Sequence, residues 1–153
     1  MKQNLMEKLL QDMDLLRNSY ANNSSHDFGH KRIMVIDDCS ITLTMINKIL
    51  RNCSNLNLEL FRDERAALKS FMELSPDVVI LDMNLQSLDG PTVAQIMKSL
   101  AVFEVPIIFI SADVDKEADI KIDGWRKTTF LSKPLRKNSL ISTIDEICAP
   151  VAA

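Results

Sequence analysis

The 153-residue chain predicts an α/β fold, a doubly wound five-stranded parallel sheet with strand order 2-1-3-4-5. From Lys31 onward, short apolar runs of strand length alternate with stretches whose apolar residues recur at helical spacing. The apolar runs are nearly continuous, as in strands of a parallel sheet that helices cover on both faces. Right-handed crossovers between such strands favour the stated order.

Five runs have the pattern of strands, and they are Ile33–Ile36, Leu56–Phe61, Val78–Leu81, Ile107–Ile110 and Thr128–Ser132. The second run alternates only weakly between apolar and polar residues, as a partly exposed edge strand does. Pro106 opens the fourth run, and proline is tolerated at the first residue of a strand.

A helix is predicted after each strand. The first four begin near Ser40, Glu64, Pro91 and Asp115, and the last is marked by Leu140, Ile141, Ile144 and Ile147. Ser40 is expected to cap the first helix, and Pro91 suits the first position of the third, where its missing N–H costs nothing. The fourth helix is expected to cover Asp115 to Trp125.

Residues 1–30 differ from the rest of the chain. Apolar residues from Met6 to Leu16 recur at 3-4-3 spacing, which predicts an amphipathic helix from about Gln3 to Asn18. Tyr20 to His30 has the composition of a linker. The predicted domains are therefore an N-terminal helix with its linker, 1–30, and an α/β domain, 31–149. The helix is too short for a coiled-coil prediction. Its apolar stripe favours packing, either on its own domain or in a homodimer.

Composition excludes several classes of protein. A net charge of −3 argues against a basic nucleic-acid-binding face. No apolar run reaches the roughly 18 residues of a membrane span, and the N-terminus has no secretory signal pattern. The three cysteines lack metal-ligand spacing, so we expect free thiols in the cytoplasm, with Cys39 as a small buried residue.

Three carboxylates stand at the ends of two predicted strands. Asp37 and Asp38 follow the first strand, and Asp82 follows the third. In the predicted strand order these strands are neighbours, and ligands bind beyond the carboxyl ends of such strands. Three carboxylates held together repel one another unless a cation lies among them. An all-oxygen set of this kind suits Mg²⁺.

Two more polar residues end predicted strands. Lys133, followed by Pro134, ends the fifth strand and can supply a positive charge, and Ser111 ends the fourth and can donate a hydrogen bond. Together with the metal these groups could neutralise a phosphoryl group transferring onto an aspartate.

These motifs carry a resemblance to a known family. They are Asp37-Asp38, the segment from Val79 through Asp82 to Gly90, Ser111-Ala112 and Lys133-Pro134. From about Lys31 to Cys148 the chain resembles the receiver domain of two-component response regulators, of the stand-alone, chemotaxis-regulator-like kind. The resemblance implies a flavodoxin-like fold.

The resemblance also implies a role for each residue. Asp82 would be the phosphoacceptor, and Mg²⁺ would be bound by Asp38, Asp82 and the backbone carbonyl of Asn84. Asp37 would position the waters of the metal and pair with Lys133. Lys133 would contact the phosphoryl group.

The same resemblance implies a switch. Ser111 would move to hydrogen-bond the phosphoryl group, and Phe130 matches the aromatic position that turns inward on activation. The sequence departs from the family pattern at Gln86, where proline is common, and at Trp125-Arg126-Lys127, where small residues are usual. The second departure affects the expected signalling face, which is formed by the fourth helix, fifth strand and fifth helix.

The resulting prediction is a non-enzymatic receiver that takes a phosphoryl group from a sensor histidine kinase or a histidine phosphotransfer protein. Because the chain ends soon after its last predicted helix, we expect output through protein contact or onward transfer in a phosphorelay. An adaptor that signals without phosphorylation is the alternative. A phosphohydrolase of the haloacid dehalogenase type is disfavoured, because such an enzyme needs an acid where this chain has Asn84.

Overall fold

The computed structural model describes residues 6–11, 31–53, 56–120 and 127–150. Its centre is one sheet in the order β2-β1-β3-β4-β5, in which every pairing is parallel. The strands are β1 (Lys31–Ile36), β2 (Leu56–Phe61), β3 (Val78–Asp82), β4 (Ile107–Ser111) and β5 (Thr128–Ser132). This topology confirms the predicted fold class.

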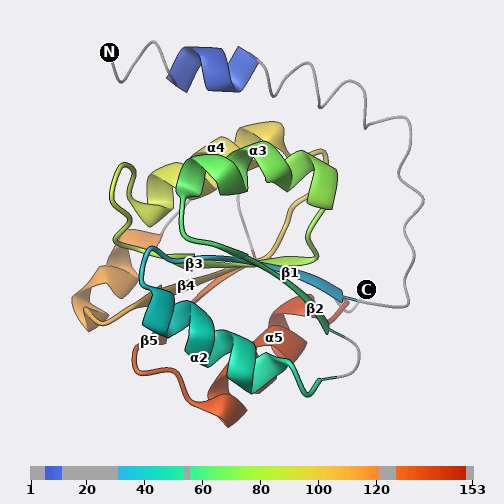
Figure 1. The fold of residues 1–153 in the computed structure, drawn as a ribbon, viewed down its shortest axis with the longest axis vertical. Coiled ribbons are helices and arrows are strands. Elements are labelled where there is room, and N and C mark those ends of the chain that lie inside the picture. The colour runs from blue at the N-terminus through green and yellow to red at the C-terminus, as the bar shows by residue number, and fades with distance from the viewer. Residues whose placement is uncertain (1–5, 12–30, 54–55, 121–126, 151–153) are drawn as a thin grey trace.

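Helices cover both faces of the sheet. They are α2 (Ser40–Leu50), α3 (Glu64–Leu74), α4 (Gly90–Leu100) and α5 (Lys137–Cys148), with a 3-10 helix, η1 (Val114–Ile120), between β4 and β5. Figure 1 shows α3 and α4 on one face and α2 and α5 on the other.

The near-continuous apolar strands contribute side chains to two separate hydrophobic cores, one on each face of the sheet. Alternate residues of a strand point to opposite faces, so Met34 and Ile36 of β1 join the core under α3 and α4, whereas Ile33 and Val35 join the core under α2 and α5. All four are fully buried. Each large apolar side chain contributes about 1.5–3 kcal/mol on burial, so a strand used on both faces is strongly held.

Two helix starts differ from the prediction. Cys39, not Ser40, occupies the N-cap position of α2, and no side chain caps that helix. The fourth helix begins as η1, a 3-10 helix, and not as the predicted α-helix. At its start Lys116 N–H donates to Asp113 O (3.3 Å), a bond between residues three apart that defines this tighter helix. The end of the predicted helix, including Trp125, lies outside the described residues.

The structure describes part of the predicted N-terminal helix. Residues 6–11 are helical, and the remainder of the predicted helix and the Tyr20–His30 linker lie outside the described residues. Met6, Leu9 and Leu10 are partly buried and pack against the core on the α3–α4 side, where Figure 1 places this segment. Within the described ranges, no helix has both the length and the apolar character needed to cross a membrane.

Candidate functional site

Three carboxylates meet at the carboxyl-terminal edge of the sheet. Asp37 and Asp38 directly follow β1, and Asp82 is the last residue of β3, the neighbouring strand. One oxygen of each lies within 4.8 Å of the others. Asp37 is fully buried and Asp82 is 5% exposed, whereas Asp38 is half-buried. The open side of the cluster is therefore the Asp38 side.

Lys133 reaches this cluster from the end of β5. Its Nζ lies 2.8 Å from Asp37 Oδ2 and 3.5 Å from Asp82 Oδ1. The backbone N–H of Lys133 donates to Ser111 O (2.8 Å), which fixes the residue beside the end of β4. The peptide bond between Lys133 and Pro134 is cis.

The negative charges of the cluster outnumber the positive charge that Lys133 supplies. Burial and then the charge of Asp37 raise the pKa of Asp82, although Lys133 and the Asn84 backbone N–H oppose this change. Burial alone would lower the pKa of Lys133, but its hydrogen bond to Asp37 and the charges of Asp37 and Asp82 raise it. One lysine thus faces three carboxylates. This excess of negative oxygen ligands fits a hard divalent cation such as Mg²⁺.

The other predicted site residues lie around this centre. Ser111 ends β4 and is fully buried, and its Oγ accepts a hydrogen bond from Asp113 N–H (3.1 Å). Asn84 is exposed, and its Oδ1 accepts a hydrogen bond from Lys116 Nζ. Phe130 is half-buried, lies beside Phe109 in register, and packs against the α3–α4 core. The side chain of Phe130 therefore sits on the face of β5 opposite to α5.

Two further residues position the site, although sequence analysis assigned neither of them a role there. A Cβ at Gly90 would lie 2.6 Å from Asp82 O, so only glycine lets α4 begin this close to the acceptor strand. Glu64 is 3% exposed and accepts two backbone hydrogen bonds from the loop that follows Asp82. Gly90 was named as the end of the motif that follows Asp82, and Glu64 was named only as the start of a helix.

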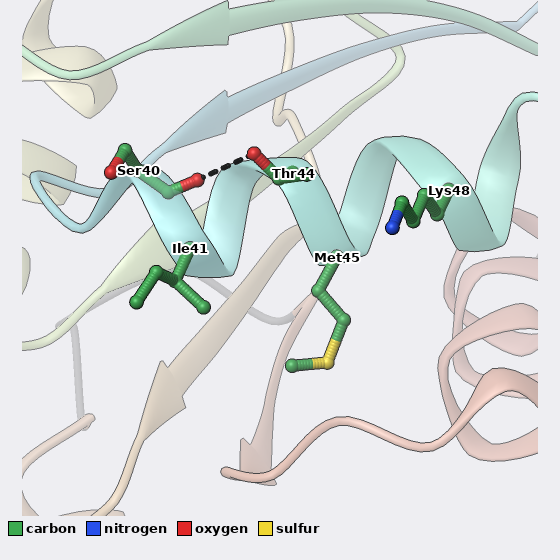
Figure 2. A pocket seen from close by; sticks show the side chains of 5 residues that line it. All are labelled: Ser40, Ile41, Thr44, Met45 and Lys48. Carbon is green, nitrogen blue, oxygen red and sulfur yellow. Dashed lines mark hydrogen bonds between the residues drawn. The ribbon is translucent and has the colours of Figure 1, made fainter.

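The outer face of α2 differs from the site in character. Ser40, Ile41, Thr44, Met45 and Lys48 line a shallow hollow of about 320 Å³, and Figure 2 shows Ile41 and Met45 projecting on the same side of the helix. Ile41 is 73% exposed.

Cys39 precedes this helix and is exposed, so the prediction of a buried residue was wrong. Its position at the N-cap explains this, because the side chain there lies outside the packed face of the helix. Polar groups at the start of α2, chiefly the backbone N–H of Thr42, lower the pKa of the Cys39 thiol.

Comparison with known proteins decides the family. Residues 33–145 match the response regulator receiver domain. The chain belongs to this family. A relative, the protein-glutamate methylesterase/protein-glutamine glutaminase 3 of Vibrio cholerae, is 35% identical over 106 residues, which cover 67% of this chain and 29% of the relative. This receiver chain therefore spans less than a third of the length of that relative.

Solved receiver structures share the fold. Vibrio cholerae chemotaxis protein CheY4 superposes with a TM-score of 0.68 at 22% identity, over 77% of this chain and 98% of that one. The receiver domain of the sensor histidine kinase PA1611 from Pseudomonas aeruginosa, solved with a magnesium ion in its active site cleft, gives a TM-score of 0.68 at 21% identity, over 78% and 98% of the two chains.

Proposed function

We propose that this receiver accepts a phosphoryl group on Asp82 in a Mg²⁺-dependent reaction. The observation that carries the proposal is the burial of the Asp82 carboxylate between two other carboxylates and the Lys133 ammonium at the strand ends. An Asp82 oxygen would attack the phosphorus of a phosphohistidine, so that a P–O bond forms as the P–N bond breaks. The imidazole leaves with a proton from solvent.

The neighbouring groups have distinct roles in this proposal. Asp38, Asp82 and the backbone carbonyl of Asn84 would hold Mg²⁺, which supplies positive charge to the phosphoryl oxygens when bound. Asp37 would orient the waters of the metal while it holds Lys133 through the 2.8 Å ion pair. Lys133, already 3.5 Å from Asp82 Oδ1, would bind a phosphoryl oxygen.

The phosphorylated state would be reported through β4 and β5. Ser111 Oγ now accepts from Asp113 N–H, and it would turn its own O–H toward the phosphoryl group. The space that Ser111 leaves would admit Phe130 from its half-buried position, and this would change the surface of η1, β5 and α5. Phosphorylation would thereby shift a two-state equilibrium that exists without it.

The partners follow from this chemistry. The donor would be a sensor histidine kinase or a histidine phosphotransfer protein in the cytoplasm, and the output would be contact with a protein rather than with nucleic acid. Onward transfer in a phosphorelay would use the same Asp82 chemistry in reverse. An adaptor that signals without phosphorylation is the competing function.

Incubation with Mg²⁺ and acetyl phosphate, followed by intact-mass measurement, separates these functions. We expect an acid-labile adduct on the wild type, none after chelation of the metal, and none on Asp82→Asn. An exposed acid, Glu73, provides the control, since Glu73→Gln should form the adduct normally. A wild-type chain that forms no adduct would favour the adaptor and overturn the proposal.

We also infer that 31–149 form the receiver and that the N-terminal helix of 1–30 packs on it in cis. The support is the burial of Met6, Leu9 and Leu10 against the α3–α4 core within one chain. A homodimer through this helix is the alternative that the sequence left open.

A further inference from the structure

Glu64 is a buried acid whose partners lie in the acceptor loop, residues 83–89. It is the first residue of α3 and is 3% exposed. Its Oε1 accepts hydrogen bonds from Ser87 N–H (2.8 Å) and Leu88 N–H (3.0 Å). Glutamate is almost never buried to this extent unless it is paired. Hydrogen bonds between a carboxylate and backbone N–H groups are stronger than neutral ones, so these two bonds tie α3 to the loop.

The acceptor loop connects Ser87 and Leu88 to Asn84, which lies beside the carboxylate cluster in sequence. The loop begins directly after Asp82 and carries Asn84. It is closed on itself by the bridge between Asn84 and Asp89 and by the bond from Gly90 N–H to Met83 O (3.0 Å). Because the loop is closed in this way, we expect a displacement of Ser87 and Leu88 to displace Asn84 as well.

The segment just before Glu64 holds the other side of the carboxylate cluster. Asp37 N–H donates to Phe61 O (3.0 Å), and Arg62 Nε donates to Asp38 O (3.4 Å). Residues 61–64 therefore bond to the loop that carries Asp37 and Asp38 and also to the loop that follows Asp82. In the proposed function these two loops carry Asp38 and Asn84, which would bind Mg²⁺, so residues 61–64 link the two segments that would supply those ligands.

From these contacts we propose that Glu64 is a positioning residue that, with residues 61–63, fixes the spacing of the two loops that supply the Mg²⁺ ligands. The tie between Glu64 and the loop stands on the hydrogen bonds alone, and its consequence for Mg²⁺ rests on the proposed function. In this proposal Glu64 would act through the backbone of the acceptor loop and not as a ligand of the metal or of the phosphoryl group.

Substitution of Glu64 tests the proposal in the metal-free protein and then with Mg²⁺ alone. We expect Glu64→Ala to lose protection of the Ser87 and Leu88 amides from hydrogen exchange, measured by NMR. The Mg²⁺ dissociation constant, read from amide shifts, should rise about tenfold, the scale on which groups behind metal ligands act. Glu64→Gln should restore most of both properties, because its amide oxygen can accept the same two hydrogen bonds.

Two control variants separate positioning from general destabilisation. Leu68 is fully buried in the same helix, so Leu68→Ala should lower stability without weakening Mg²⁺ binding. Glu73→Gln removes an exposed negative charge from α3 and should change neither property. The proposal is overturned if Leu68→Ala weakens Mg²⁺ binding as much as Glu64→Ala does.

The wild type alone also tests the proposal. Fast exchange of both the Ser87 and Leu88 amides would overturn it even if Glu64→Ala failed to fold. These measurements use no phosphodonor. A wild type that binds Mg²⁺ with both amides protected but takes no phosphoryl group would therefore support the role of Glu64 while contradicting the proposed function.

Discussion

At the scale of single residues, the surroundings of Asp82 disfavour its ionised form when no cation is bound. Burial and the charge of Asp37 raise the pKa of Asp82, so the folded protein binds a proton there more tightly than the unfolded chain does. The free energy of unfolding consequently falls as pH rises through the range between the unfolded and folded pKa values. A cation bound among the carboxylates would favour the ionised form of Asp82 and so raise the free energy of unfolding at neutral pH.

We expect Asp82→Asn to stabilise the metal-free protein at neutral pH, because the variant has no carboxylate to bury. Its melting temperature should exceed that of the wild type by roughly 2–4 °C. The difference should vanish below the unfolded pKa and reach its full size above the folded pKa. Thermal unfolding at a series of pH values measures this. A difference that stays constant with pH would contradict the electrostatic account, and Glu73→Gln controls for the removal of an exposed acid.

The candidate site was predictable where its residues end strands. Asp37, Asp38 and Asp82 follow apolar runs whose order in the sheet could be argued from handedness and helix placement. Glu64 could not be found in this way. An acid in the first turn of a helix is the common signal of a solvent-exposed helix start, because it favours the helix dipole there. Only the folded loop reveals that this acid is buried.

At the scale of elements, α4 begins against the backbone of the acceptor strand. A Cβ at Gly90 would meet Asp82 O at 2.6 Å and Met83 Cα at 2.9 Å, and both are backbone atoms that cannot rotate away. Glycine here is required by the close approach.

We expect Gly90→Ala to lower the free energy of unfolding by about 2 kcal/mol, through the strain of inserting an atom into a packed contact. The displaced loop should also slow phosphorylation by acetyl phosphate. Denaturant unfolding measures the first effect and intact mass the second. Gln95→Ala, at an exposed position of the same helix, should change neither. An alanine variant as stable as the wild type would contradict the close contact.

The first turn of α2, which begins soon after Asp37 and Asp38, presents an exposed apolar side chain. Ile41 is 73% exposed and lies three residues after Asp38. In the proposed function a protein donor would bring its histidine to Asp82 at this edge of the sheet, whereas a small phosphodonor would need no such surface.

We therefore expect Ile41→Ala to slow phosphotransfer from a histidine-phosphorylated partner by about fivefold, the effect of losing one significant interface contact. The rate with acetyl phosphate should be unchanged. Rapid-quench assays with both donors measure the two rates. Val102 is 50% exposed beyond the end of α4, and Val102→Ala serves as the matched control. Equal slowing with both donors would show that Ile41 does not act through partner contact.

The elements differ in how far the sequence could predict them. The central strands were predictable because their residues are apolar on both faces, which leaves few other structures open to them. The form of η1 was not predictable from spacing alone. Asp113 bonds both to Asp115 N–H through its Oδ1 (3.1 Å) and to Lys116 N–H through its carbonyl, and these local bonds favour the tighter helix.

At the scale of the whole molecule, the helical residues 6–11, which precede the first strand in sequence, pack on the α3–α4 side of the sheet. Met6, Leu9 and Leu10 pack against the α3–α4 core, and α4 begins at the acceptor loop. The amphipathic stripe predicted burial of this helix. It could not say against which surface, because many apolar surfaces satisfy the same pattern.

Deletion of residues 1–22 tests the cis arrangement. We expect light scattering to give a monomer mass for both the full chain and the deletion variant. The variant should unfold at a lower temperature by roughly 2–4 °C, since it loses part of its apolar burial. A full-length dimer that becomes a monomer on deletion would show that the helix packs in trans.

The central claim is that Asp82 carries the phosphoryl group, and chemical trapping tests it most directly. Borohydride reduces an acyl phosphate to an alcohol, so peptide mapping of the Mg²⁺- and acetyl phosphate-treated protein locates the modified aspartate. We expect the alcohol at Asp82 alone. Its appearance at Asp37 or Asp38 instead, or an unmodified Asp82 in a chain that has gained a phosphoryl group, would contradict the account.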